Sequence, residues 1–218
     1  MNKGRILVVE DDKIIALEIK ERLADFGYNV IAMVKTGYLA IEQAIVNKPD
    51  LILMDVNLEG EIDGIVTAER IRKVVNIPII YLTALADDET VNRAKLTMPY
   101  GYIVKPLDER ELRSAIEIAL FKHKTERILT DSESRYKAIV RSLEAELYLV
   151  DENRKIIFSN RSSDDGLELQ DVNKNCYKTI FSRNIVCENC SMDLVKEGEI
   201  KKSEMYDEKK KQWYSIIT

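Results

Sequence analysis

Short apolar runs and amphipathic segments alternate through the first half of the chain, and this alternation restricts the fold more than any other feature. The runs are RILVVE, YNVIAMV, DLILMD, IPIIYLT and YGYIVKP; the amphipathic segments are residues 13–26, 38–47, 64–75, 87–94 and the stretch from about residue 108. Strands that alternate with helices form a parallel sheet with helices on both faces and right-handed crossovers. We therefore expect an α/β fold with a doubly wound, five-stranded parallel sheet.

Polar residues follow the predicted strands. Asp55 comes directly after four consecutive apolar residues, a pattern typical of a strand that is covered on both faces. In open α/β sheets the carboxyl ends of the strands meet at the edge that carries the functional site. The residues expected at this edge are Glu10, Asp11, Asp12, Asp55, Thr83 and Lys105.

This set of side chains suits phosphoryl transfer. Clustered carboxylates repel one another unless a cation or a proton separates them, and oxygen ligands select a hard ion such as Mg²⁺. A bound ion and an ammonium group can neutralise the oxygens of a phosphoryl group, and one of the acids would be the acceptor. There is a simpler interpretation of the acids at 10–12, because acids favour helix N-termini. We assign only Asp12 to such capping. Thr83 and Lys105, taken singly, would fit ordinary surface positions.

Residues 1–122 resemble the flavodoxin-like receiver domain of two-component response regulators. The resemblance rests on ILVVEDD, LILMD, YLTA and GYIVKP, each at the end of its own strand in the family's order. It implies that a partner histidine kinase phosphorylates Asp55 in the presence of Mg²⁺, and that the domain supports only its own phosphorylation and dephosphorylation. It also implies a metal site made of the Glu10, Asp11 and Asp55 carboxylates and the Asn57 backbone carbonyl. Thr83 and Lys105 would contact the phosphoryl group, and Tyr102 would be an aromatic whose rotamer follows Thr83. Pro106 would form a tight, often cis, turn.

Two details qualify the resemblance. The loop NLEGEIDG, residues 57–64, is one residue longer than the family's common form and lacks its usual proline. Tyr102 also has a plainer interpretation as a half-buried aromatic of a strand.

A long helix is predicted after the fifth strand. No glycine or proline occurs from Glu109 to Arg127, and apolar residues recur with helical spacing. Residues 123–141 are predicted to form a helical linker, weakly interrupted at 130–134, that pairs with a second copy of the chain in a homodimer. The single histidine, His123, lacks the following acid and downstream proline of a kinase phosphohistidine, so we expect it to face solvent.

The remaining residues, 142–218, predict an antiparallel architecture. ELYLVDENRKIIFSN is typical of two short strands about a turn, and GEIKKSEMYDEKKKQWYSIIT of a second hairpin. The opening LYLVDENRKIIFSN and the closing QWYSIIT resemble a PAS domain, a small α+β sensory or dimerisation module. The chain ends before the last strand or two of a PAS sheet, so we expect this domain to be truncated or completed by other strands.

Three cysteines, Cys176, Cys187 and Cys190, lie in this second segment, the last two as C-x-x-C. Such a pair can bind zinc or an iron–sulfur cluster, or exchange disulfides. Three cysteines without a nearby histidine are one ligand short of a closed metal site, so a structural or incidental role is the other interpretation. A redox or metal sensor that uses Cys187 and Cys190 is one alternative function.

Composition restricts partners and location. A formal net charge of −5 without a basic stripe argues against direct nucleic-acid binding. The N-terminus turns acidic before a long apolar stretch develops, and no run approaches the length that spans a bilayer, so we expect a cytoplasmic protein with reduced thiols and no membrane association. A second alternative is that these residues are the N-terminal part of a hybrid sensor histidine kinase whose catalytic domains lie beyond Thr218.

Overall fold

The computed structural model describes residues 3–84, 97–143, 147–160, 172–188, 190–193, 202–207 and 211–217. The chain divides into two compact units, Met1–Asp131 and Ser132–Thr218. The helix predicted at residues 87–94 lies outside the described residues. Among the described residues, no helix combines the length and the apolar character needed to cross a bilayer.

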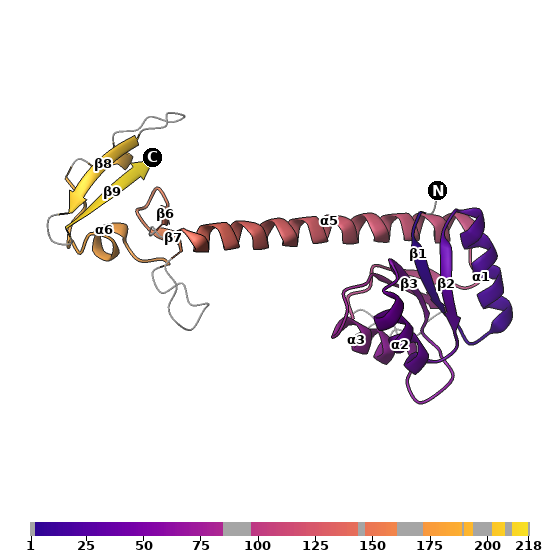
Figure 1. The fold of residues 1–218 in the computed structure, drawn as a ribbon. Coiled ribbons are helices and arrows are strands. Elements are labelled where there is room, and N and C mark those ends of the chain that lie inside the picture. The colour runs from indigo at the N-terminus through magenta and orange to yellow at the C-terminus, as the bar shows by residue number, and fades with distance from the viewer. Residues whose placement is uncertain are drawn as a thin grey trace. The chain divides into compact units, whose positions relative to one another are not determined.

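The first unit is built on a five-stranded parallel sheet (Figure 1). Its strands are β1 (Arg5–Val9), β2 (Asn29–Val34), β3 (Leu51–Asp55), β4 (Ile79–Thr83) and β5 (Gly101–Val104), in the order β2-β1-β3-β4-β5. This order confirms the predicted flavodoxin-like sheet. Asp55 pairs with Leu82 and Thr83 with Val104, so the carboxyl ends of β3, β4 and β5 share one edge.

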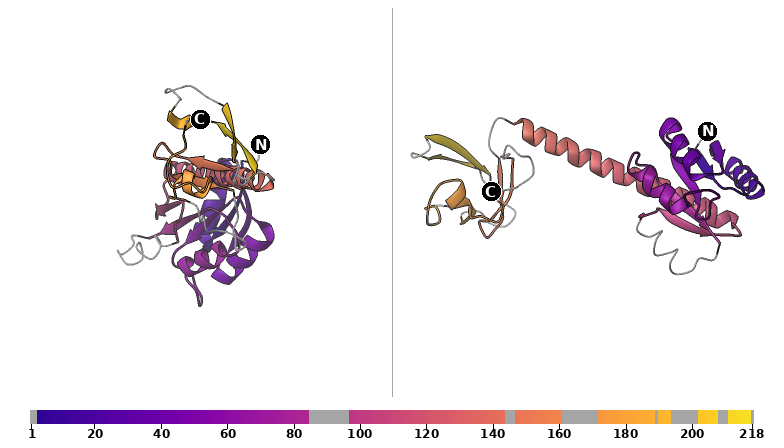
Figure 2. Two further views of the ribbon diagram at one scale, coloured as in Figure 1. Left: turned by 90° about the vertical axis from the view of Figure 1, so that its left-hand side faces the viewer. Right: turned by 90° about the horizontal axis from the view of Figure 1, so that it is seen from below.

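Helices cover both faces of this sheet (Figures 1 and 2). They are α1 (Lys13–Asp25), α2 (Gly37–Asn47), α3 (Gly64–Arg72) and the long α5 (Glu109–Ser142). Successive strand residues point to opposite faces, so Ile6 and Val8 join a core with α1 and α5, while Leu7 joins a core with α2 and α3. The buried strands predicted from apolar runs thus become the centre of a three-layer unit.

Aspartates begin three of the helices. Asp12 precedes α1, and its carboxylate accepts hydrogen bonds from the backbone N–H groups of Ile14 (2.7 Å) and Ile15 (3.3 Å). Asp63 caps α3 and Asp108 caps α5 in the same way. These bonds satisfy N–H groups that lack a partner within the helix. The capping role predicted for Asp12 is confirmed.

His123 is buried, and our expectation of a solvent-facing histidine is wrong. Its side chain is only 9% exposed, and its ring meets the ring of Tyr100 edge-on, with 5.6 Å between centroids. The reason is helical spacing: positions 112, 116, 119 and 123 follow one another along the face of α5 that packs on the sheet. The weak interruption predicted at residues 130–134 is also absent, since α5 continues to Ser142.

The second unit contains two separate antiparallel hairpins, best seen in Figure 2. Strands β6 (Tyr148–Val150) and β7 (Ile156–Ser159) form the first hairpin, and β8 (Lys202–Asp207) and β9 (Gln212–Ile217) form the second. Both hairpins were predicted and are confirmed. The short helices are α6 (Cys176–Thr179) and η1 (Ser191–Asp193). A small core of Ile156, Cys176, Ile180 and Phe181 packs between these elements.

Candidate functional site

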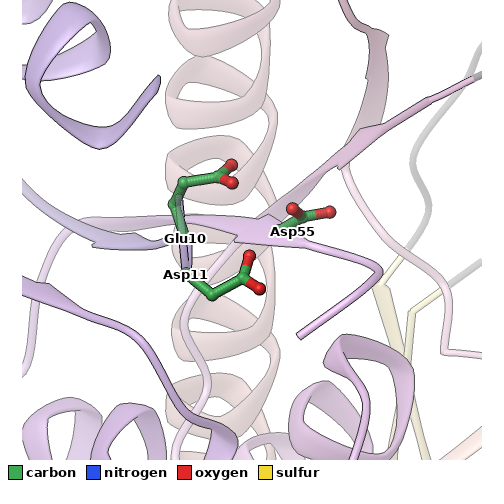
Figure 3. Close-up of side chains that lie close together, drawn as sticks. All are labelled: Glu10, Asp11 and Asp55. Carbon is green, nitrogen blue, oxygen red and sulfur yellow. The ribbon is translucent and has the colours of Figure 1, made fainter. Parts of the chain in front are cut away.

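Three acids meet at the carboxyl edge of the parallel sheet (Figure 3). Glu10 and Asp11 follow β1, and Asp55 is the last residue of β3. Each side chain has a carboxylate oxygen within 4.8 Å of an oxygen of the other two. Glu10 and Asp55 are nearly inaccessible, at 2% and 4% exposure. The structure therefore brings together acids that are 45 positions apart in the sequence.

Lys105 places one ammonium group between two of these acids. Its Nζ lies 2.7 Å from Glu10 Oε2 and 2.7 Å from Asp55 Oδ2. The Lys105 backbone N–H donates to the Thr83 carbonyl (2.8 Å), which holds the residue at the end of β5 beside β4. The Lys105–Pro106 peptide bond is cis, as expected for this turn. Because buried carboxylates are costly without a partner, this ammonium is part of what allows the cluster to be buried.

The protonation of the cluster reflects its burial. Burial raises the pKa of Glu10 to about 7, although the hydrogen bond from Lys105 opposes the shift and the charge of Asp55 adds to it. Burial acts to lower the pKa of Lys105, but its hydrogen bonds to Asp55 and Glu10 outweigh this effect and raise it. Lys105 is therefore charged at neutral pH. The carboxyl groups of Glu10, Asp11 and Asp55 form an oxygen-rich site, and this donor set fits Mg²⁺.

Backbone groups fix the position of the Asp55 side chain. The Asn57 N–H donates to Asp55 Oδ1 (3.0 Å), while Oδ2 is held by Lys105. Asn57 thus lies beside the cluster, and the role of its carbonyl as a metal ligand stays a prediction. Both Asp55 oxygens have a hydrogen-bond donor, so the carboxylate has a defined orientation.

Gly64 is a positioning residue that the sequence analysis missed. A Cβ at this position would lie 1.9 Å from the Asp55 carbonyl oxygen, and the Gly64 N–H donates to the Val56 carbonyl (2.9 Å). Only glycine allows α3 to begin this close to the end of β3. The available signal was a glycine directly after the capping Asp63.

Thr83 and Tyr102 lie on the neighbouring strands. Thr83 ends β4, is 7% exposed, and donates its hydroxyl to the Ala84 carbonyl (2.7 Å). Tyr102 is half-buried on β5, with its ring centroid 5.8 Å from that of Tyr81. The buried Tyr102 hydroxyl has no hydrogen-bond partner in the described part of the chain, and burial raises its pKa. Rotating either side chain therefore breaks at most one side-chain hydrogen bond.

The cysteines form no comparable site. Cys176 is buried, Cys187 and Cys190 are half-buried, and all three are free thiols. Burial raises the pKa of Cys176 and of Cys187, which makes both thiols less reactive. Within the described ranges, the acidic trio is the only group of side chains close enough to hold a metal ion.

Comparison with known proteins places the site in context. The profile of the response regulator receiver domain matches residues 6–117. The transcriptional regulatory protein PdtaR of Mycobacterium tuberculosis is 36% identical over 116 residues, which is 53% of this chain and 56% of PdtaR. The chain thus spans little more than half the length of this relative.

Two solved structures are also similar. The signal receiver domain of a modulated diguanylate cyclase from Desulfovibrio desulfuricans is 37% identical with a TM-score of 0.55, covering 56% of this chain and 98% of that one. The N-terminal domain of a response regulator/sensory box/GGDEF three-domain protein from Carboxydothermus hydrogenoformans is 34% identical with a TM-score of 0.51 and the same coverages.

Proposed function

Because this chain belongs to the family of response regulator receiver domains, we propose that its Asp55 accepts a phosphoryl group from a partner histidine kinase. The observation that carries the proposal is the setting of the Asp55 carboxylate, which lies within 4.8 Å of two other acids and 2.7 Å from the Lys105 ammonium. Glu10, Asp11 and Asp55 would hold Mg²⁺. The bound ion would neutralise charge on the phosphoryl oxygens.

In the proposed reaction, an Asp55 carboxylate oxygen forms a bond to phosphorus while the P–N bond of a phosphohistidine breaks. The electron pair of that bond leaves with the imidazole, which then takes up a proton. The Lys105 ammonium and the Asn57 N–H each contact one of the two Asp55 oxygens. A positive charge and a hydrogen-bond donor therefore already lie close to where the phosphoryl oxygens would bind. The chain's own groups therefore orient the acceptor before the donor binds.

Phosphorylation would change the surroundings of Thr83 and Tyr102. An added charge of about −1.5 to −2 attracts hydroxyl donors. The Thr83 hydroxyl would leave the Ala84 carbonyl for a phosphoryl oxygen, and the Tyr102 ring, whose hydroxyl holds no bond, would follow. β5 and α5 share a core through Ile103 and Leu112, so α5 would carry this change out of the receiver.

We propose that residues 123–141 act as the helical linker between a receiver at 1–122 and a PAS-like module at 142–218. The two antiparallel hairpins and the small core around Ile156 support this assignment. The Carboxydothermus protein, described as a response regulator/sensory box/GGDEF three-domain protein, names a response regulator part before a sensory part, which is the order that we propose here.

The acceptor is tested with a small phosphodonor such as acetyl phosphate and Mg²⁺, followed by intact mass. We expect the wild type and Glu59→Gln, an exposed acid in the loop after Asp55, to gain one phosphoryl group. Asp55→Asn should gain none. Equal uptake by Asp55→Asn would refute the assignment.

The proposal also includes a homodimer. On α5, Ile118 and Phe121 are 63% and 72% exposed, an apolar surface that a second copy would cover. Light scattering with and without beryllofluoride tests this. We expect dimer formation by the wild type and by Arg135→Ser, and a monomer for Phe121→Ser. A monomeric wild type under both conditions would exclude the homodimer.

A further inference from the structure

A groove of about 890 Å³ lies at the amino-terminal edge of the parallel sheet, opposite the acidic site. One wall is α5 from Leu120 to Asp131, and the other consists of residues at or before the starts of β1, β3 and β4. The groove exists because α5 continues past the edge of the sheet. Its volume is in the range of small-molecule sites.

The groove has an excess of positive charge that the protein does not neutralise. Five Lys or Arg residues and two Asp residues line it. Among the residues that the structure describes, the charged groups of Lys48, Lys124 and Arg127 have no ion-pair or hydrogen-bond partner. The carboxylate of Asp50, by contrast, is already engaged by the backbone N–H of Arg5 at 2.7 Å. Three cations in one groove are therefore available to a ligand.

His123 adds a second, independent observation. It lines this groove, it is 91% buried, and its Nε2 has no hydrogen-bond partner within the described ranges. A buried nitrogen without a partner is rare in native proteins, and an ordered water or an ion is one explanation for it. Burial and the charge of Arg127 lower the pKa of His123, while the Asn76 backbone and Glu126 act in the opposite direction. The ring is therefore neutral at pH 7 in the free protein.

We propose that this groove binds a small phosphate ester, with its phosphate oxygens against Lys48, Lys124 and Arg127 and its organic part between His123 and Leu120. A dianionic group matches several cations at once, and charge-assisted hydrogen bonds are the strong ones. Leu120 and Ile128, which also line the groove, offer apolar contact to the organic part. This site is separate from the Asp55 cluster and does not depend on the phosphoacceptor proposal.

The single histidine makes a direct test possible, because its ring protons are identified in a proton NMR spectrum without assignment. The full chain is titrated with phenyl phosphate in EDTA, so that no divalent ion bridges the probe to the acidic site. We expect a saturable shift of the His123 ring signals with phenyl phosphate. The apparent pKa of His123 should rise at saturation, because the bound dianion favours the charged ring.

Variants separate this site from general charge effects. Lys124→Ala/Arg127→Ala should weaken phenyl phosphate binding at least about tenfold, the lower range for losing a charge-assisted hydrogen bond. Lys20→Ala/Arg135→Ala removes the same charge from exposed helical positions and should bind like the wild type. Asp55→Asn should also bind normally. Unchanged binding by the Lys124/Arg127 variant, lost binding by Asp55→Asn, or the absence of a saturable shift would each overturn the proposal.

Discussion

Replacing Lys105 with methionine tests whether its ammonium makes the buried acids of the site tolerable. Methionine keeps much of the side-chain length but leaves Glu10 and Asp55, at 2% and 4% exposure, without the cation that lies 2.7 Å from each. Removing one partner of a buried ion pair costs about 3–5 kcal/mol. The lower end applies here, because Glu10, with its pKa already raised to about 7, can take up a proton. We expect a loss of about 3 kcal/mol in the free energy of unfolding.

Urea unfolding measures this loss if the probe reports on the receiver. The single tryptophan, Trp213, lies in the second unit. Its fluorescence therefore reports the unfolding of that unit, not of the receiver, and serves as an internal control. Far-UV circular dichroism follows the helices instead, most of which, α1, α2, α3 and α5 up to Asp131, belong to the first unit. Lys20→Met, an exposed replacement on α1, is the matched control and should stay within about 0.5 kcal/mol of the wild type.

Mg²⁺ gives the same prediction a second readout. A divalent cation between the acids replaces the lost positive charge, so saturating Mg²⁺ should stabilise Lys105→Met more than it stabilises the wild type. If Lys105→Met unfolds within about 0.5 kcal/mol of the wild type without Mg²⁺, Lys105 does not compensate the buried acids.

Three further substitutions probe other parts of the chain. Gly64→Ala places a Cβ 1.9 Å from a backbone oxygen and should abolish phosphoryl uptake measured by intact mass, whereas Gly101→Ala, with 3.9 Å of space, should retain it. The lowered pKa of His123 means that the unfolded state binds its proton more readily, so stability should fall as pH drops below about 6.5; His123→Phe should flatten that slope in urea titrations. Ile156→Ala should destabilise the second unit by about 2–5 kcal/mol, followed by Trp213 fluorescence.

Each of these has a clear contrary result. Equal phosphoryl uptake by the two glycine variants would show that the start of α3 has room to move away from β3. An unchanged pH slope in His123→Phe would mean that the histidine has the same pKa in the folded and unfolded states. A cost below about 0.5 kcal/mol for Ile156→Ala would mean that the small core contributes little.

Several of the correct predictions depend on residues close together in sequence. The apolar run that ends at Asp55 predicts a buried strand and the exit of its last residue at the sheet edge, because run length and side-chain alternation are local. The capping by Asp12 is equally local, since its partners are two and three residues away. The failure at His123 has the opposite cause: the expectation of a solvent-facing ring rested on the residues next to it in sequence, but Tyr100 and the packed face of α5 decide its burial.

The sequence by itself determined that the first half forms a five-stranded parallel sheet, that acids follow its strands at one edge, and that two hairpins come later, because the type of each element and its end are readable from local patterns. Only the tertiary structure decided how those residues act on one another. In the folded chain, Lys105 lies between Glu10 and Asp55, and Gly64 packs closely on the backbone of Asp55. A cationic groove also forms between α5 and the amino-terminal edge of the sheet. These relations depend on distances between residues that are far apart in the chain, and no local pattern encodes such distances.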